Sequence, residues 1–108
     1  MIAQTPKPPY YAVIFTSIRT DQQHAEYSAM AERMDELAKE QPGYLGIESA
    51  REGLGITVSY WENLEAIKNW KNHAEHVIAQ QTGRSDWYKH YKTRIALVER
   101  DYGFESKI

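Results

Sequence analysis

The sequence contains no cysteine. Disulfide bonds, thiolate metal sites and cysteine nucleophiles are therefore excluded. Long apolar runs are also missing: the longest extend for about six residues, far short of a membrane span or of the apolar core of a signal peptide. We therefore expect a cytoplasmic protein with no membrane partner.

Neither sign of charge dominates. The 13 Lys and Arg stand against 15 Asp and Glu, which gives a formal net charge of −2. The basic residues are scattered, whereas nucleic-acid-binding domains gather them in a patch or stripe. We therefore expect no nucleic-acid partner. The sequence also lacks a serine nucleophile elbow, a phosphate-binding loop and a dinucleotide fingerprint.

Aromatic residues are plentiful. They make up 12% of the 108 residues, led by eight Tyr and three Trp, and hydrophobic residues make up 42%. This length and composition predict one globular domain. Because Tyr and Trp bury a large area while keeping a polar group, they suit an interface or a ligand pocket.

The first elements are an arm and a strand. Residues 1–9 contain three prolines and predict an extended arm, so the domain is expected over residues 10–104. "YYAVIFTSIR" (10–19) is rich in β-branched and aromatic residues and predicts a strand. Apolar residues fall on both faces of this strand, so both faces should be covered.

A helix is expected next. Thr20 or Asp21 can cap it, and Gln23 completes a capping box with Thr20. "QPG" at 41–43 ends the helix, because Pro cannot continue it and Gly permits the turn. The apolar residues that recur at helical spacing are Tyr27, Met30, Met34, Leu37 and Ala38.

The second half repeats the alternation of strands and helix. "YLGIESAR" (44–51) and "GITVSYWE" (55–62) predict a hairpin whose short turn contains Gly53 and Gly55. Asn63 can cap a second helix. Asn72 with Glu75 forms another capping-box pattern, which predicts that this helix breaks and restarts at Asn72.

The remaining sequence predicts the end of that helix at Gly83 and a long last strand over 88–104. The order strand, helix, strand, strand, helix, strand is the βαββαβ pattern of an α+β, ferredoxin-like fold. Both helices then cover one face of an antiparallel four-stranded sheet. The other face would expose a large apolar patch, so we expect a second copy of the sheet to cover it in a homodimer.

His73 and His76 are the sharpest candidates for chemistry. They lie three residues apart on the second helix, a spacing compatible with a metal site, but a third ligand from another element would be needed. His24 and His90 lie on other elements, and their position relative to the pair is open. We therefore predict no metal and interpret His73 as a histidine on the edge of the buried stripe that lines a pocket.

The aromatic residues of the second half have two interpretations. They form the core and dimer packing, or they line a cleft between helices and sheet where a flat substrate stacks. The residues concerned are Tyr44, Tyr60, Trp61 and Trp70.

Arg94 is a charged residue within an apolar run of the last strand. It pairs with Glu48 across the sheet, or it binds an anionic or phenolate oxygen in the pocket. Both interpretations stay open at this point, and the pair is the simpler one.

The run that begins "PGYLGIES" resembles the antibiotic biosynthesis monooxygenase family, especially its small single-domain members. The resemblance covers about residues 10–102. It implies a dimeric α/β barrel made of two ferredoxin-like sheets, and oxidation of polycyclic phenols by O₂ without metal, haem or flavin. No cofactor is therefore expected. Besides "PGYLGIES" (42–49), the residues that carry the resemblance are Tyr60, Trp61, Trp70, Gln80, Gly83 and Trp87.

Haem-degrading enzymes share this fold, and the resemblance to them is poorer. They use a helix Trp, a later His in the same helix segment and an Asn on the first strand. Trp70 matches the Trp, but the His would fall near Ala79 or Gln80, and residues 10–19 contain no Asn. Haem degradation is therefore disfavoured.

The sequence thus predicts a cofactor-independent monooxygenase acting on a small aromatic or quinol. Its expected parts are His73 as base or hydrogen-bond partner, Trp70 and Trp61 as pocket wall, and Arg94 as anion stabiliser. Two other functions stay open: a homodimeric module that binds or senses a small ligand without turnover, and an isomerase that uses the base but no O₂.

Overall fold

The computed structural model describes residues 1–21, 24–80 and 87–108. The predicted order of elements and the ferredoxin-like fold are confirmed. The elements are β1 (Tyr10–Arg19), α1 (His24–Lys39), β2 (Tyr44–Glu52), β3 (Leu54–Trp61), α2 (Leu64–Gln80) and β4 (Tyr88–Val98).

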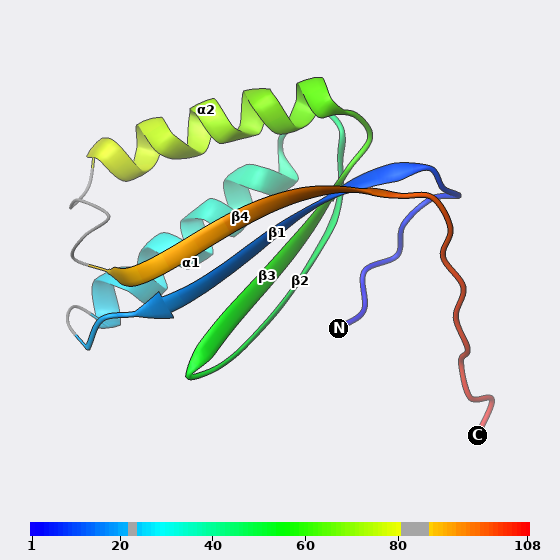
Figure 1. Cartoon of the computed structure of the whole chain (residues 1–108), viewed down its shortest axis with the longest axis horizontal. Coiled ribbons are helices and arrows are strands. Elements are labelled where there is room, and N and C mark those ends of the chain that lie inside the picture. The colour runs from blue at the N-terminus through cyan, green and yellow to red at the C-terminus, as the bar shows by residue number, and fades with distance from the viewer. Residues whose placement is uncertain (22–23, 81–86) are drawn as a thin grey trace.

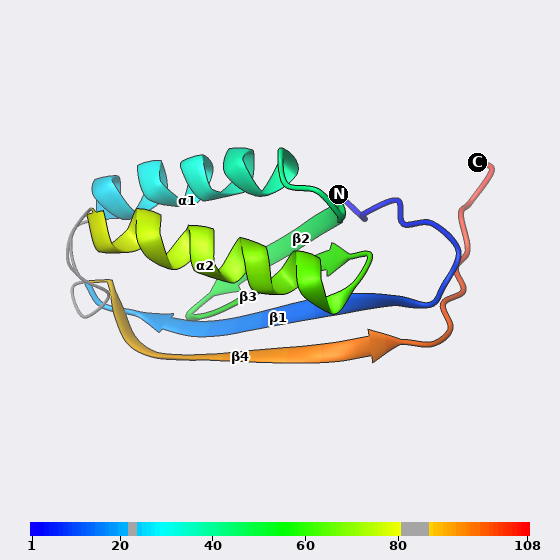
Figure 2. The ribbon, with the colours of Figure 1, turned by 90° about the horizontal axis from the view of Figure 1, so that it is seen from above.

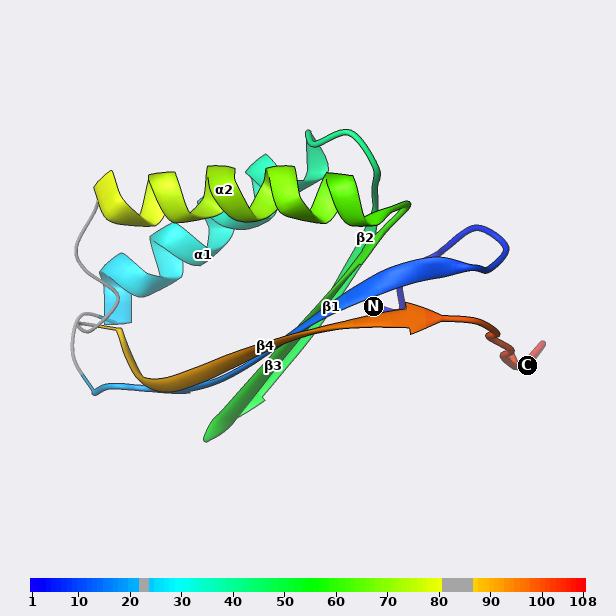
Figure 3. The same ribbon diagram turned by 45° about the horizontal axis from the view of Figure 1, so that its top comes forward.

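The four strands form one antiparallel sheet in the order β2-β3-β1-β4. Both helices lie on the same side of it, α1 against β2 and α2 against β3 (Figures 1 and 3). Seen from the helix side, β4 forms the outer edge of the sheet (Figure 2). Among the described residues, no helix has the length and apolar character needed to cross a membrane.

Strand register separates two faces. Tyr11, Val13 and Trp61 pack against α2, which defines the helix-covered face. Because successive side chains of a strand alternate, their neighbours point to the opposite, open face. The apolar and aromatic residues of the open face are Tyr10, Ala12, Ile14, Ile18, Ala50, Leu54, Ile56, Val58, Tyr60, Ala96 and Val98.

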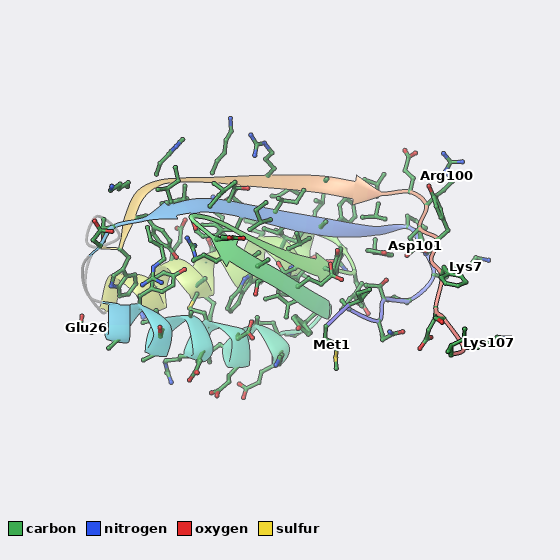
Figure 4. The ribbon with its side chains drawn as sticks, turned by 90° about the horizontal axis from the view of Figure 1, so that it is seen from below. Met1, Lys7, Glu26, Arg100, Asp101 and Lys107 are labelled. Atoms are coloured by element: carbon green, nitrogen blue, oxygen red, sulfur yellow. The ribbon has the colours of Figure 1, made fainter. Side chains whose placement is uncertain are left out.

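The two termini contact the open face at one end of the sheet. The N–H of Ala3 donates to Oε2 of Glu48 over 2.9 Å. The hydroxyl of Thr5 donates to the hydroxyl of Tyr10, which itself donates to Oδ2 of Asp101 over 2.6 Å. Figure 4 shows Met1 and Asp101 at this end, opposite the start of α1. Residues 1–9 have no helix or strand, but they are tied to the sheet.

Three local predictions are wrong. The helix does not restart at Asn72: α2 continues to Gln80, because each further residue adds a hydrogen bond whereas a restart needs a new nucleus. Gly55 lies inside β3 and not in the hairpin turn. The last strand ends at Val98 and not at 104. Val98 pairs with Tyr10, the first residue of β1, and residues 1–9 form no strand with which β4 could pair further.

The cap of α2 is confirmed. The side-chain Oδ1 of Asn63 accepts a 2.8 Å hydrogen bond from the N–H of Ala66, the third residue of the helix. This bond satisfies one of the donors that the start of a helix leaves without a backbone partner. Gln23, predicted to complete the capping box of the first helix, and Gly83, predicted to end the second helix, lie outside the described residues.

Candidate functional site

A row of four rings lies between α2 and the sheet. Trp70 stacks on Trp61, with ring centroids 6.0 Å apart and an angle of 23° between the planes. Tyr44 meets Trp61 edge-on at 5.7 Å. The imidazole of His73, one turn after Trp70, lies 6.0 Å from the Trp70 ring. These residues form the Trp70 cluster.

The Trp70 cluster runs from the core to the surface. Trp61 is fully buried, and its indole N–H donates to Oγ of Ser59 over 2.9 Å. Trp70 is half-buried and His73 is exposed. Burial, and then the charge of Asp35, raise the pKa of Tyr44, so its hydroxyl stays protonated at neutral pH. Because His73 is exposed and contacts Trp70, a planar ligand placed against Trp70 would meet an imidazole that solvent can reach.

Two predicted site residues do not join this cluster. Tyr60 directly precedes Trp61 in β3, so strand alternation turns it to the open face. Arg94 is aligned with Ile14 and lies on the open face as well. Within one chain, the Trp70 cluster therefore contains the predicted residues Tyr44, Trp61, Trp70 and His73, and lacks Tyr60 and Arg94.

The predicted pair of Glu48 and Arg94 is wrong. The two residues are in one row of the open face, but Val58 and Ile14 lie between them, so their strands are three spacings or about 14 Å apart. Glu48 instead accepts hydrogen bonds from Tyr60 and Ala3. These two bonds, with that of Tyr60 the stronger cause, lower the pKa of Glu48.

The histidines are dispersed. His73 and His76 are both exposed on α2, and His90 lies opposite Ile18 on β4. The side chain of His24 lies outside the described part of the chain. Over residues 1–21, 24–80 and 87–108, no three His, Asp or Glu side chains gather as metal ligands would. Among the described residues, a ring contact thus sets the imidazole of His73 beside the aromatic surface of Trp70.

A second cluster lies under α1, and none of its members is among the predicted site residues. The Arg19 guanidinium lies over the Tyr27 ring at 3.7 Å, and the Arg51 guanidinium is 5.9 Å from the same ring. The hydroxyl of Tyr88 donates to the hydroxyl of Tyr27 over 3.2 Å. These residues form the Tyr27 cluster.

The core of α1 adjoins the Tyr27 cluster. Trp87 is almost fully buried beside Tyr27, with ring centroids 6.2 Å apart, and packs with Met30. Among the described residues, no acceptor is within hydrogen-bond distance of the Trp87 indole N–H. Side chains from α1, β1, β2 and β4 thus meet here, which residue spacing along one element does not reveal.

Comparison with known proteins agrees with this architecture. The family model of the antibiotic biosynthesis monooxygenases matches residues 9–82, more than half of the chain. The chain belongs to this family. It is also 50% identical over 106 residues to the uncharacterized protein YqjZ of Bacillus subtilis, covering 96% of this chain and 92% of that protein.

Solved structures show the same fold. PA3566 of Pseudomonas aeruginosa superposes with a TM-score of 0.68 at 14% identity, covering 90% of this chain and 99% of that one. SnoaB of Streptomyces nogalater, a cofactor-independent oxygenase, superposes with a TM-score of 0.63 at 12% identity, covering 92% and 100%. At 12 to 14% identity, these similarities show that the chain shares the fold of the two structures, and nothing beyond the fold.

Proposed function

We propose that this chain is a monooxygenase that oxidises a small phenol or quinol with O₂ at the Trp70 cluster and needs no cofactor. Membership of the family and the fold shared with an oxygenase support the reaction class. The observation that carries the choice of site is the contact between His73 and Trp70, because it sets a proton acceptor beside an aromatic wall.

The reaction balances without an outside reductant. A phenol with a free para C–H reacts with one O₂ to give a quinone and one water: one oxygen atom enters the ring, and the other leaves with the two hydrogens. Loss of the phenolic proton comes first, because the resulting anion is rich enough in electrons to reduce O₂. His73 accepts this proton, and Trp70 and Trp61 hold the ring. Arg94 has no part in this scheme, because it lies on the other face.

We also propose that the chain forms a homodimer through the open face. Both described helices lie on the other face, and several large apolar side chains of the open face are exposed in a single chain. Contiguous apolar surface of this kind marks an interaction site. A second copy presents an equally apolar sheet, so pairing two open faces would remove both from water.

Oxygen uptake tests the oxygenase. Wild-type protein, His73→Ala and the matched control His76→Ala are compared with a panel of hydroquinones and polycyclic phenols. We expect His73→Ala to lower turnover by about 10²-fold, the usual contribution of a general base, while His76→Ala keeps wild-type turnover. Equal uptake by wild type and His73→Ala would remove His73 from the mechanism. A phenol that binds without O₂ uptake above the uncatalysed rate would identify a binding module.

A further inference from the structure

Two positive charges approach one tyrosine in the Tyr27 cluster. The guanidinium of Arg19 is stacked on the Tyr27 ring, and that of Arg51 lies farther out over the same ring. Among the described residues, Arg51 has no carboxylate partner. An anion bound beside Arg51 would gain charge-assisted hydrogen bonds from its guanidinium.

A hydrogen bond to another strand orients the side chain of Arg51, a residue of β2. Its Nη2 donates a 2.6 Å hydrogen bond to Oγ of Ser17, a buried residue of β1, although β3 lies between the two strands. The residue of β3 in this row is Gly55. A methyl group at Gly55 would overlap the Arg51 guanidinium, so glycine leaves the space through which Arg51 reaches Ser17. The guanidinium is thus preorganised while Arg51 itself is solvent-exposed.

Aromatic rings lie near Ser17, the residue to which the Arg51 guanidinium donates. Phe15, Tyr88 and Tyr91 contact one another with centroids 5.3 to 5.6 Å apart. Tyr91 lies directly opposite Ser17, on the side away from Arg51. Burial, and then the hydrogen bond to Tyr27, raise the pKa of Tyr88 despite the nearby charges of Arg51 and Arg19, so its hydroxyl remains a donor.

We propose that the Tyr27 cluster binds a small aromatic carboxylate, with its carboxylate on Arg51 and its ring against Phe15 and Tyr91. A planar guanidinium offers two parallel N–H donors that match the two oxygens of a carboxylate. An inorganic anion would interact with the positive charge of Arg51 but would make no contact with the aromatic rings. The three contacting rings beside the charge favour an anion that carries a flat apolar group. This site is independent of the proposed oxygenase reaction.

Calorimetry with 2-naphthoate tests this site. The neutral analogue 2-naphthalenemethanol has the same ring system without the charge. We expect saturable binding of naphthoate, and binding of the alcohol that is weaker by roughly tenfold or more, as for loss of a hydrogen-bonded charge. Equal affinity of the two compounds would overturn the proposal. Inorganic phosphate that displaces naphthoate at equal concentration would overturn the aromatic part of the assignment.

Variants locate the site. Arg51→Gln should weaken naphthoate binding roughly tenfold or more, and Arg51→Lys, which keeps the charge but loses the paired donors, by a smaller factor. The matched control is Arg94→Gln, which removes an arginine from the open face and should leave affinity unchanged. Circular dichroism verifies that each variant is folded. Folded Arg51→Gln with wild-type affinity, or an equal loss in Arg94→Gln, would overturn the proposal.

Discussion

The hydroxyl of Tyr60 donates a 2.6 Å hydrogen bond to Oε1 of Glu48 on the open face of the sheet. The other carboxylate oxygen accepts the N–H of Ala3. Both bonds favour the ionised carboxylate and lower its pKa below the ordinary value of 4.5. Burial, and then the bond to Glu48, raise the pKa of Tyr60 to about 12. The hydrogen bond between Tyr60 and ionised Glu48 therefore persists over a wide pH range, which ends where Glu48 gains its proton in acid and where Tyr60 loses its proton in alkali.

Acid should weaken the fold through Glu48. A carboxyl group whose pKa is lower in the folded protein contributes stability above its unfolded pKa, near 4.5, and this contribution is lost as the pH falls through the folded pKa. Glu48→Gln should thus be less stable than wild type at pH 7, and the difference should shrink below pH 4.5. Urea unfolding between pH 7 and pH 3 measures this; parallel pH profiles would contradict it.

Alkali should weaken the same pair through Tyr60. A tyrosine whose pKa is raised in the folded protein contributes stability that is fully present below its ordinary pKa of 10.0 and is lost as the pH rises through about 12. Tyr60→Phe should therefore lose less stability than wild type between pH 9 and pH 11. The measurement is thermal unfolding across this range. An identical alkaline loss in both proteins would show that Tyr60 is not responsible.

Local patterns in the sequence predict the elements and one of the two clusters. Trp70 and His73 are one turn apart on a helix, so their contact follows from helical spacing alone. The prediction places Tyr60 in the same pocket as Trp61, whereas strand alternation turns these adjacent residues to opposite faces. The alternation of apolar and polar residues along 55–62 in the sequence also indicates opposite faces for Tyr60 and Trp61.

Contacts across several strands were not predictable in the same way. Glu48 and Arg94 have complementary charges, but strand order, which separates them, depends on the packing of the whole sheet. The bond between Arg51 and Ser17 requires the register of β2, β3 and β1 together with the missing side chain of Gly55. Register is set by hydrophobic burial and turn geometry acting together, so a single segment does not reveal it.

Two glycines with positive φ should differ in their sensitivity to alanine. Gly43 has a φ of 85°, and Gly53 has a φ of 77°. A methyl at Gly43 would lie 2.6 Å from Cβ of Ala66, whereas a methyl at Gly53 would meet nothing within 4 Å. Gly53→Ala should cost about 1 kcal/mol of backbone strain, and Gly43→Ala clearly more because it adds a steric overlap with α2. Urea unfolding of both variants decides, and equal losses would contradict the steric argument.

The two stacked tryptophans should contribute unequally to stability. Trp61 is fully buried, so Trp61→Ala should lower the free energy of unfolding by about 3 to 5 kcal/mol. It would also leave Oγ of buried Ser59 without the indole donor. Trp70 is only half-buried, so Trp70→Ala should cost less. Chemical denaturation measures both; a larger loss in Trp70→Ala than in Trp61→Ala would contradict the burial order.

The last prediction concerns the homodimer. Light scattering should give about 25 kDa, twice the chain mass of 12.6 kDa. Ile56 lies on the open face and is 42% exposed in a single chain, so Ile56→Glu places a charge where one chain tolerates it but a sheet-on-sheet interface does not. We expect this variant to lose the dimer, either as a 12.6 kDa species or by failing to fold alone.

Leu64→Glu is the matched control, because Leu64 is also apolar and is 54% exposed, but it lies at the start of α2. A negative charge there is favourable for the helix, so the dimer and its stability should be retained. A folded wild-type protein of 12.6 kDa at micromolar concentration would refute the homodimer. A folded dimer of Ile56→Glu would instead show that the chains associate through another surface, since a buried, unpaired carboxylate in an open-face interface would oppose association.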